Sequence, residues 1–193
     1  MIFFDTGAGA REDVAIIRKA VERFIDRIGD RPIAVGTFGE TPVLITTFED
    51  DRSALGPKLD AAIANPHGLS VPTRGAALGG QTIRAVQPLF SAIVIVSAAP
   101  LDGMPDTSEE VLAPIIDSGA VVHVIANRAG TGPGATSPAV NAIRSLAEQT
   151  HGEFFARESH IHFELYVRIK GDVVAGSRDR DGISSFAFVR RAA

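Results

Sequence analysis

The chain has 193 residues, of which 45% are hydrophobic, carries a formal net charge of -4 and contains no cysteine. This length supports one substantial core, so we expect a single domain over residues 1–193. The acidic balance argues against binding to nucleic acid or anionic lipid. No segment reaches the roughly 18 apolar residues that a membrane-spanning helix needs. The lack of cysteine excludes disulfides, thiolate nucleophiles and cysteine-ligated zinc.

The N-terminal residues lack the basic and apolar regions of a signal peptide, so the chain as given is not predicted to be exported. A chain whose second residue already lies in a predicted core strand is also compatible with a domain of a longer secreted protein. The sequence therefore leaves the compartment open.

The first half of the chain alternates predicted strands and helices. Residues 2–5 form a strand, and an amphipathic helix follows, with apolar residues every three or four positions up to Gly29. The β-rich runs 33–38 and 43–48 are separated by a short turn, which predicts an antiparallel hairpin. We expect further helices over residues 52–64 and from Thr73 to about residue 86.

The second half continues this alternation. Residues 92–98 are apolar without a break, as expected of a central parallel strand. A helix over 108–117, a strand over 120–126, a glycine-rich loop, a helix over 139–150 and a short strand at 154–155 follow. The pattern predicts a three-layer, doubly wound, Rossmann-like α/β fold, with a mostly parallel six-stranded sheet and one antiparallel edge strand.

The C-terminal segment gives two conflicting signals. Residues 160–170 alternate apolar and polar side chains, which favours a strand, but they also carry an apolar stripe at helical spacing. The choice between helix and strand stays open there, whereas residues 183–189 are predicted to form a strand.

Doubly wound sheets bind ligands beyond the carboxyl ends of their strands. The loops at that edge are predicted at residues 5–11, 72–75, 97–105 and 127–138. Candidate functional residues are therefore sought in these four loops.

Three segments at this edge follow a known pattern in order and spacing. Asp5-Thr6-Gly7-Ala8-Gly9 ends the first strand, Thr73 opens a helix, and Ser97-Ala98-Ala99 ends the most apolar strand. The chain thus resembles the von Willebrand factor A (vWA) family, whose pattern is D-x-S-x-S, a distant Thr and a later T-D-G. Residues 146–155 also look like the helix-to-strand passage near the end of bacterial vWA domains.

In that family the two Asp, two Ser and one Thr side chains form a metal-ion-dependent adhesion site for a divalent cation, which favours oxygen ligands. Here the two serine positions are Gly7 and Gly9, and the second Asp position is Ala98. The resemblance implies a non-catalytic protein-interaction module with a degenerate metal site and no required cofactor. The ligand-binding candidates are Asp5, Gly7, Gly9, Thr73, Ser97 and Asp102. A residual site for Mg²⁺ or another divalent cation would use Asp5, Thr73 and Asp102, or Asp106 in place of Asp102.

Asp5 and Thr73 could instead have purely structural roles. Asp5 at a strand end can accept hydrogen bonds from the backbone of the following turn, and Thr73 is placed to cap its helix. We expect the partner to be a protein that contacts the loop residues Leu101, Met104, Pro105 and Pro133.

Other chemistries have weaker support. The Asp-Thr-Gly-Ala segment resembles aspartic proteases, but those enzymes are all-β. A small-molecule or nucleotide site on residues 5–11 is the main alternative, although Glu12 stands where a dinucleotide motif has its third glycine. His160, His162 and Glu164 are expected to form a solvated face rather than a zinc site, and His123 is expected to be a core histidine.

Overall fold

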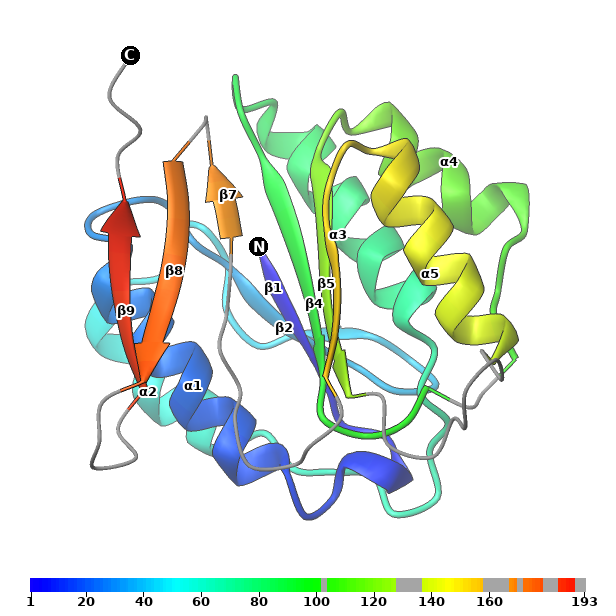
Figure 1. Cartoon of the computed structure of the whole chain (residues 1–193), viewed down its shortest axis with the longest axis horizontal. Coiled ribbons are helices and arrows are strands. Elements are labelled where there is room, and N and C mark those ends of the chain that lie inside the picture. The colour runs from blue at the N-terminus through cyan, green and yellow to red at the C-terminus, as the bar shows by residue number, and fades with distance from the viewer. Residues whose placement is uncertain (102–103, 128–136, 158–166, 170–171, 179–183, 190–193) are drawn as a thin grey trace.

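The computed structural model describes residues 1–101, 104–127, 137–157, 167–169, 172–178 and 184–189. Its main body is a six-stranded sheet in the order β3-β2-β1-β4-β5-β6 (Figure 1). All neighbouring strands are parallel except β3, which pairs antiparallel with β2 at one edge. This confirms the predicted sheet and its antiparallel edge strand. The strands are β1 Ile2–Asp5, β2 Val35–Phe38, β3 Val43–Leu44, β4 Ala92–Ser97, β5 Val121–Asn127 and β6 Phe154–Arg157.

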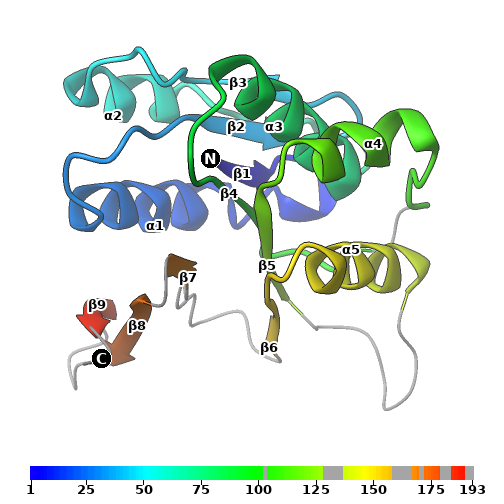
Figure 2. The same cartoon turned by 90° about the horizontal axis from the view of Figure 1, so that it is seen from above.

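Helices cover both faces of this sheet, which gives three layers (Figure 2). Helices α1 (Val14–Arg27) and α2 (Arg52–Asp60) lie on one face. Helices α3 (Pro72–Val86), α4 (Glu109–Asp117) and α5 (Pro138–Gln149) lie on the other. A short 3₁₀ helix, Ala8–Ala10, precedes α1. None of the helices in the described segments is long and apolar enough to cross a bilayer.

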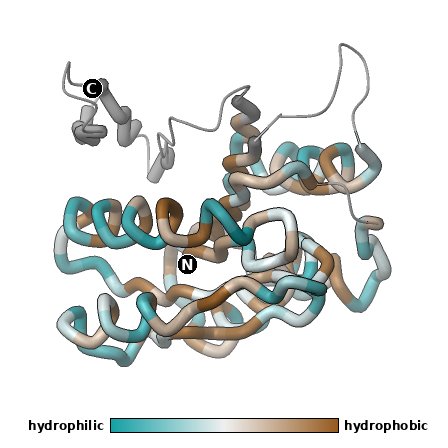
Figure 3. Tube along the Cα trace, turned by 90° about the horizontal axis from the view of Figure 1, so that it is seen from below, coloured by the Kyte–Doolittle hydropathy of each residue, from teal (hydrophilic) through white to brown (hydrophobic). Residues whose placement is uncertain are grey.

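The two faces of the sheet carry two separate cores. Because side chains alternate along a strand, Phe3 packs under α3 whereas Phe4 packs under α1. The same alternation divides β4, where Ile93 faces the α3 side and Val94 the α1 side. Figure 3 shows the hydrophobic residues concentrated along the central strands and the hydrophilic ones on the outer turns of the helices.

Two glycines allow close approach between elements. A Cβ on Gly80 of α3 would overlap the carbonyl oxygen of Pro114 in α4, and a Cβ on Gly152 would overlap the carbonyl oxygen of Val122 in β5. Gly152 follows the end of α5, where His151 has a φ of 60° and Gly152 N donates to Ala147 O over 2.8 Å. That bond closes the helix and turns the chain directly into β6.

Helices α1 and α2 cap each other through arginines. Arg18 of α1 donates from Nη1 to carbonyl oxygens at the end of α2, those of Leu59, Asp60 and Ala62. Arg52 of α2 donates to carbonyl oxygens at and beyond the end of α1, with 2.7 Å between Nη1 and Ile25 O. Because the last carbonyls of a helix have no partner within it, these contacts supply the missing donors.

The C-terminal residues form a second, separate sheet. Strands β7 (Val167–Ile169), β8 (Asp172–Arg178) and β9 (Ser184–Val189) pair antiparallel in that order. Residues 167–169 are therefore strand rather than helix, and the strand expected over 183–189 is confirmed for its described part. The rest of the ambiguous segment, including His160, His162 and Glu164, lies outside the described residues.

Candidate functional site

Asp5 and Ser97 lie at the carboxyl ends of the adjacent central strands β1 and β4. The chain passes from β1 to β2 on one side and later returns to β4 on the other, so the strand order reverses between β1 and β4. This is the point at which open α/β sheets place their ligands. Two of the predicted site residues are thus located at the topological switch point.

The Asp5 carboxylate is fully buried and surrounded by donors. Its Oδ1 accepts hydrogen bonds from Gly7 N at 2.8 Å and from the Ser70 hydroxyl at 2.7 Å. Its Oδ2 accepts from the Ser97 hydroxyl at 2.6 Å, and Ser97 Oγ also lies 3.0 Å from the carbonyl oxygen of Ala99. Charge-assisted bonds of this length are among the stronger hydrogen bonds in proteins. The backbone bond from Gly7 is the role expected for a carboxylate at a strand end.

Ser70 was not predicted as a site residue. It lies in the connection between α2 and α3, and backbone bonds join that connection to the β1 end, from Asn65 N to Thr6 O (2.8 Å) and from Ala8 N to Gly68 O (2.9 Å). Nothing in the spacing of the sequence links residue 70 to residue 5. Only the folded position of this loop brings the hydroxyl to the carboxylate.

Gly7 and Gly9 stand in different surroundings. A Cβ on Gly7 would lie 2.2 Å from Ser70 Oγ and 3.2 Å from Asp5 Oδ1, whereas a Cβ on Gly9 would meet only Ala99 Cβ, at 3.3 Å. Heavy atoms that are not bonded do not approach to 2.2 Å, so with a side chain at residue 7 the Ser70 hydroxyl could not keep its present position against Asp5. Position 9 needs only a slight adjustment to accept a methyl group.

Thr73 does not cap α3, contrary to expectation. The helix begins at Pro72 after Val71, so Thr73 is its second residue, and no side-chain cap is present. Val71 stands at the cap position and Pro72 is the first helical residue, so the Thr73 side chain lies inside the first turn instead of before it. The Thr73 hydroxyl is buried, with the residue 1% exposed, and Oγ1 has no hydrogen-bond partner among the described residues.

Of the two remaining acidic candidates, the structure describes Asp106, whereas Asp102 lies outside the described residues. Asp106 pairs with Arg74, with 2.9 Å between Nε and Oδ2, and also accepts from the Ser108 hydroxyl at 2.8 Å. The hydrogen bond from Arg74, followed by that from Ser108, lowers the pKa of Asp106. Asp106 is therefore engaged at the surface rather than free to turn towards Asp5.

The expected apolar contact residues are only partly exposed. Leu101 was predicted to lie on the surface, but it is 2% exposed and packs in the core under α3, α4 and α5. Met104 is 79% exposed, and Leu69, which precedes Ser70, is 59% exposed. Pro133 lies outside the described residues. Met104 and Leu69 are thus large exposed apolar side chains in the described part of this edge, and Pro105 is half-buried.

The side chains at this edge match a divalent-cation site poorly. Gly7, Gly9 and Ala98 bring no side-chain oxygen, and the oxygens beside Asp5 belong to neutral hydroxyls that donate to it. Hard divalent cations bind several oxygen ligands, usually including more than one carboxylate. Across the described segments, no group of three or more His, Asp or Glu residues is placed to bind a metal ion.

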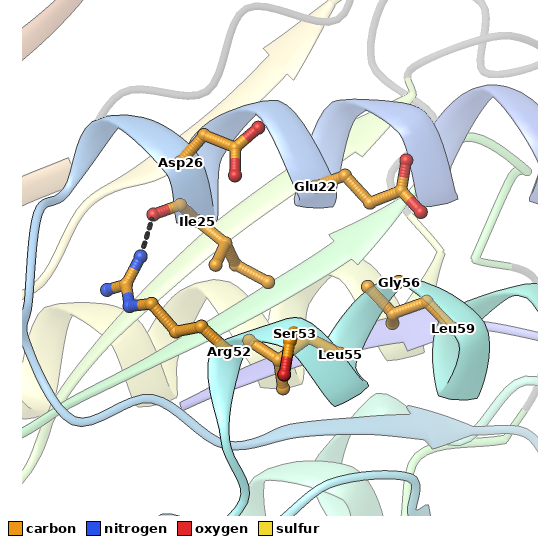
Figure 4. Close-up of a pocket in the computed structure, with 8 residues that line it drawn as sticks. All are labelled: Glu22, Ile25, Asp26, Arg52, Ser53, Leu55, Gly56 and Leu59. Atoms are coloured by element: carbon orange, nitrogen blue, oxygen red, sulfur yellow. Dashed lines mark hydrogen bonds between the residues drawn. The ribbon is translucent and has the colours of Figure 1, made fainter.

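A pocket of about 380 Å³ lies between α1 and α2, at the opposite end of α1 from Asp5 (Figure 4). Its walls carry the carboxylates of Glu22 and Asp26, and Arg52 crosses it to reach the carbonyl oxygen of Ile25. The guanidinium thus serves the end of α1, and this pocket is distinct from the site at the strand ends.

His123 is a core histidine, as expected. It is 1% exposed within β5, and its Nδ1 accepts a hydrogen bond from Glu153 N at 3.3 Å. This contact joins the start of β6 to β5 and gives His123 a structural role.

Comparison with known proteins shows the fold. No family model and no curated protein matches the sequence. Among solved structures, the von Willebrand factor type A protein from Catenulispora acidiphila superposes with a TM-score of 0.62 at 15% identity, over 82% of this chain and 38% of that one. Proximal thread matrix protein 1 from the mussel byssus, with a zinc-occupied metal-ion-dependent adhesion site, gives 0.58 at 13% identity, over 81% and 41%.

BatB from Bacteroides thetaiotaomicron gives a TM-score of 0.60 at 13% identity, over 82% of this chain and 89% of that one. The chain thus spans about two fifths of the Catenulispora and mussel proteins, but most of BatB. The six-stranded sheet with its flanking helices has the vWA-type α/β fold.

Proposed function

We propose that this chain is a non-catalytic interaction module that binds a protein partner through the loops at the carboxyl edge of its sheet, without a cation. The observation that carries the proposal is the arrangement around Asp5. Both oxygens of this buried carboxylate accept hydrogen bonds from within the chain, from Gly7, Ser70 and Ser97. The Asp5 oxygens, which a bound cation would need as ligands, are thus already engaged by donors of the chain.

The vWA-type fold supports an interaction role, because the neighbours include a byssus matrix protein and a vWA protein. The apolar contact surface would centre on Leu69, which precedes the Asp5 partner Ser70, and on Met104 in the loop after β4, both of them exposed. An interface of modest size needs such apolar anchors within a polar rim. Arg74 and Asp106 would supply part of that rim.

The alternative, a nucleotide or small-molecule site on residues 5–11, has less support. A phosphate at such a loop is bound by free backbone N–H groups. Here the N–H of Gly7 donates to Asp5, that of Ala8 to Gly68 O, and that of Ala10 to Gly7 O. These three backbone donors, which a phosphate could use, are thus engaged within the chain.

The proposal is tested by immobilising the protein in EDTA and capturing proteins from an extract of its source organism. A specific partner should be retained by the wild type and by Leu89→Glu, a control at the opposite edge of the sheet, where Leu89 is 95% exposed. It should be lost with Met104→Glu or Leu69→Glu. A partner that binds only when Mg²⁺, Mn²⁺ or Ca²⁺ is restored, or that is lost equally with Leu89→Glu, would contradict the proposal.

A further inference from the structure

We infer that Ser70 occupies the place of a side chain at residue 7, and that the hydroxyls of Ser70 and Ser97 replace a divalent cation as the partners of Asp5. The inference concerns the same edge as the interaction surface and rests on the proposed function for its biological meaning. It adds one specific point to that proposal: the hydroxyls of Ser70 and Ser97, instead of a metal ion, are the partners of Asp5.

The first support is steric. Ser70 Oγ lies so close to Gly7 that a Cβ there would stand 2.2 Å from it, so the observed position of the Ser70 hydroxyl requires a glycine at residue 7. The Cβ of a serine at residue 7 would overlap the Ser70 hydroxyl. The loss of an oxygen ligand at residue 7 is thus coupled to the gain of a hydroxyl from another loop.

The second support is the hydrogen bonding of the carboxylate. Ser70 donates to Oδ1 and Ser97 to Oδ2, over 2.7 and 2.6 Å, and all three side chains are at least nine-tenths buried. A buried carboxylate needs either a cation or several donors to offset its desolvation. The two hydroxyls and the Gly7 amide provide these donors without a cation.

The consequence is a fixed binding edge. Ser97 belongs to the end of β4, Asp5 to the end of β1, and Ser70 to the loop that carries the exposed Leu69. The cluster therefore ties that loop to the two central strands. Cation-dependent sites change with metal concentration, whereas this one is held by the chain alone.

The experiment is a double-mutant cycle on thermal stability. Gly7→Ala should lower the Tm by roughly 5 °C or more, because the methyl group collides with Ser70 Oγ. In a Ser70→Gly background the same change should cost less than half as much. Gly9→Ala is the matched control in the same loop and should lower the Tm by no more than about 2 °C.

A second arm tests replacement of the cation. Millimolar Mg²⁺, Mn²⁺, Ca²⁺ or Zn²⁺ should leave the wild-type Tm unchanged, since a ligand that binds only the folded state would raise it. If Gly7→Ala fails to fold, Ser70→Ala takes its place, because it keeps the glycine and removes one bond. In that variant the Gly7 amide should exchange its hydrogen faster than in the wild type, as measured by NMR, because Asp5 is held by one donor fewer.

Two results would overturn the inference. One is an equal cost of Gly7→Ala with and without Ser70, or unchanged Gly7 exchange in Ser70→Ala. The other is a wild-type Tm that rises with a cation and no longer rises in Asp5→Asn. Both readouts use the isolated chain, so they are independent of whether the capture experiment finds a partner.

Discussion

Replacing Thr73 by valine should make the protein more stable. The Thr73 hydroxyl is buried in the first turn of α3 and has no hydrogen-bond partner within the described part of the chain. A buried, unsatisfied hydroxyl costs about 1–2 kcal/mol. Valine has nearly the same shape and a similar helix propensity, so it removes this cost without leaving a cavity. For a chain of this size the gain corresponds to a Tm increase of roughly 2–8 °C.

The measurement is urea unfolding together with a thermal melt of Thr73→Val and of Thr82→Val. Thr82 lies in the same helix, but its hydroxyl donates to Leu78 O over 2.8 Å. The same substitution there removes a satisfied hydrogen bond and should leave the unfolding free energy unchanged or lower it by about 0.5–1 kcal/mol. The expected outcome is a higher unfolding free energy for Thr73→Val and no increase for Thr82→Val.

A fall in stability at Thr73 as large as that at Thr82 would refute this reasoning. It would mean that the hydroxyl has a favourable partner in solution, such as an ordered water. A stabilised Thr73→Val that also loses partner binding would instead show that the hydroxyl is retained for recognition at the expense of stability.

Three further outcomes are expected. Gly152→Ala should lower the unfolding free energy, measured by urea titration, by about 3 kcal/mol or more, because the new Cβ would overlap the Val122 carbonyl. The control is Gly29→Ala, where φ is 70° but no atom lies near the new Cβ, and it should lower the unfolding free energy by only about 1–2 kcal/mol. Burial lowers the pKa of the Met1 amine, which donates to Ala92 O, from 8.0 to about 5. The unfolded chain then takes up a proton between pH 8 and pH 5 that the folded chain does not. The unfolding free energy should therefore fall by up to about 1.4 kcal/mol per pH unit as the pH drops through that window. Nα-acetylation removes the titrating amine and should abolish this part of the pH dependence. Arg52→Met should lower the unfolding free energy by about 1–3 kcal/mol, because the carbonyl oxygens at the end of α1 lose their hydrogen-bond donor. Arg52→Lys should recover only part of this loss.

The layout of the fold was predictable because it follows from local periodicity. The alternation of apolar runs such as 92–98 with amphipathic helices such as residues 14–28 fixes which segments are strands, and short connections fix their neighbours. The antiparallel hairpin at residues 35–44 was visible from its turn. The segment over 160–170 was not decided, because alternation and a helical stripe coincide there, and residues 167–169 pair as a strand only through β8.

The site was predictable only in part. Asp5 and Ser97 could be placed together because parallel strands end at one edge of a sheet. Thr73 was expected to cap its helix, but Pro72 begins the helix one residue earlier and leaves the hydroxyl inside. Leu101 was expected on the surface because it lies in a loop, yet the loop folds back into the core.

The sequence by itself thus determined which segments are strands and helices, the three layers and the edge that carries Asp5, because these follow from apolar periodicity along short stretches of chain. The order of the strands in the sheet came from the structure. Only the tertiary structure decided what surrounds Asp5. Ser70 is separated from Asp5 by a helix, a hairpin and another helix, and its hydroxyl reaches the carboxylate through backbone bonds between two irregular loops. Loop positions of this kind are set by long-range packing and hydrogen bonding, which leave no periodic trace in the sequence.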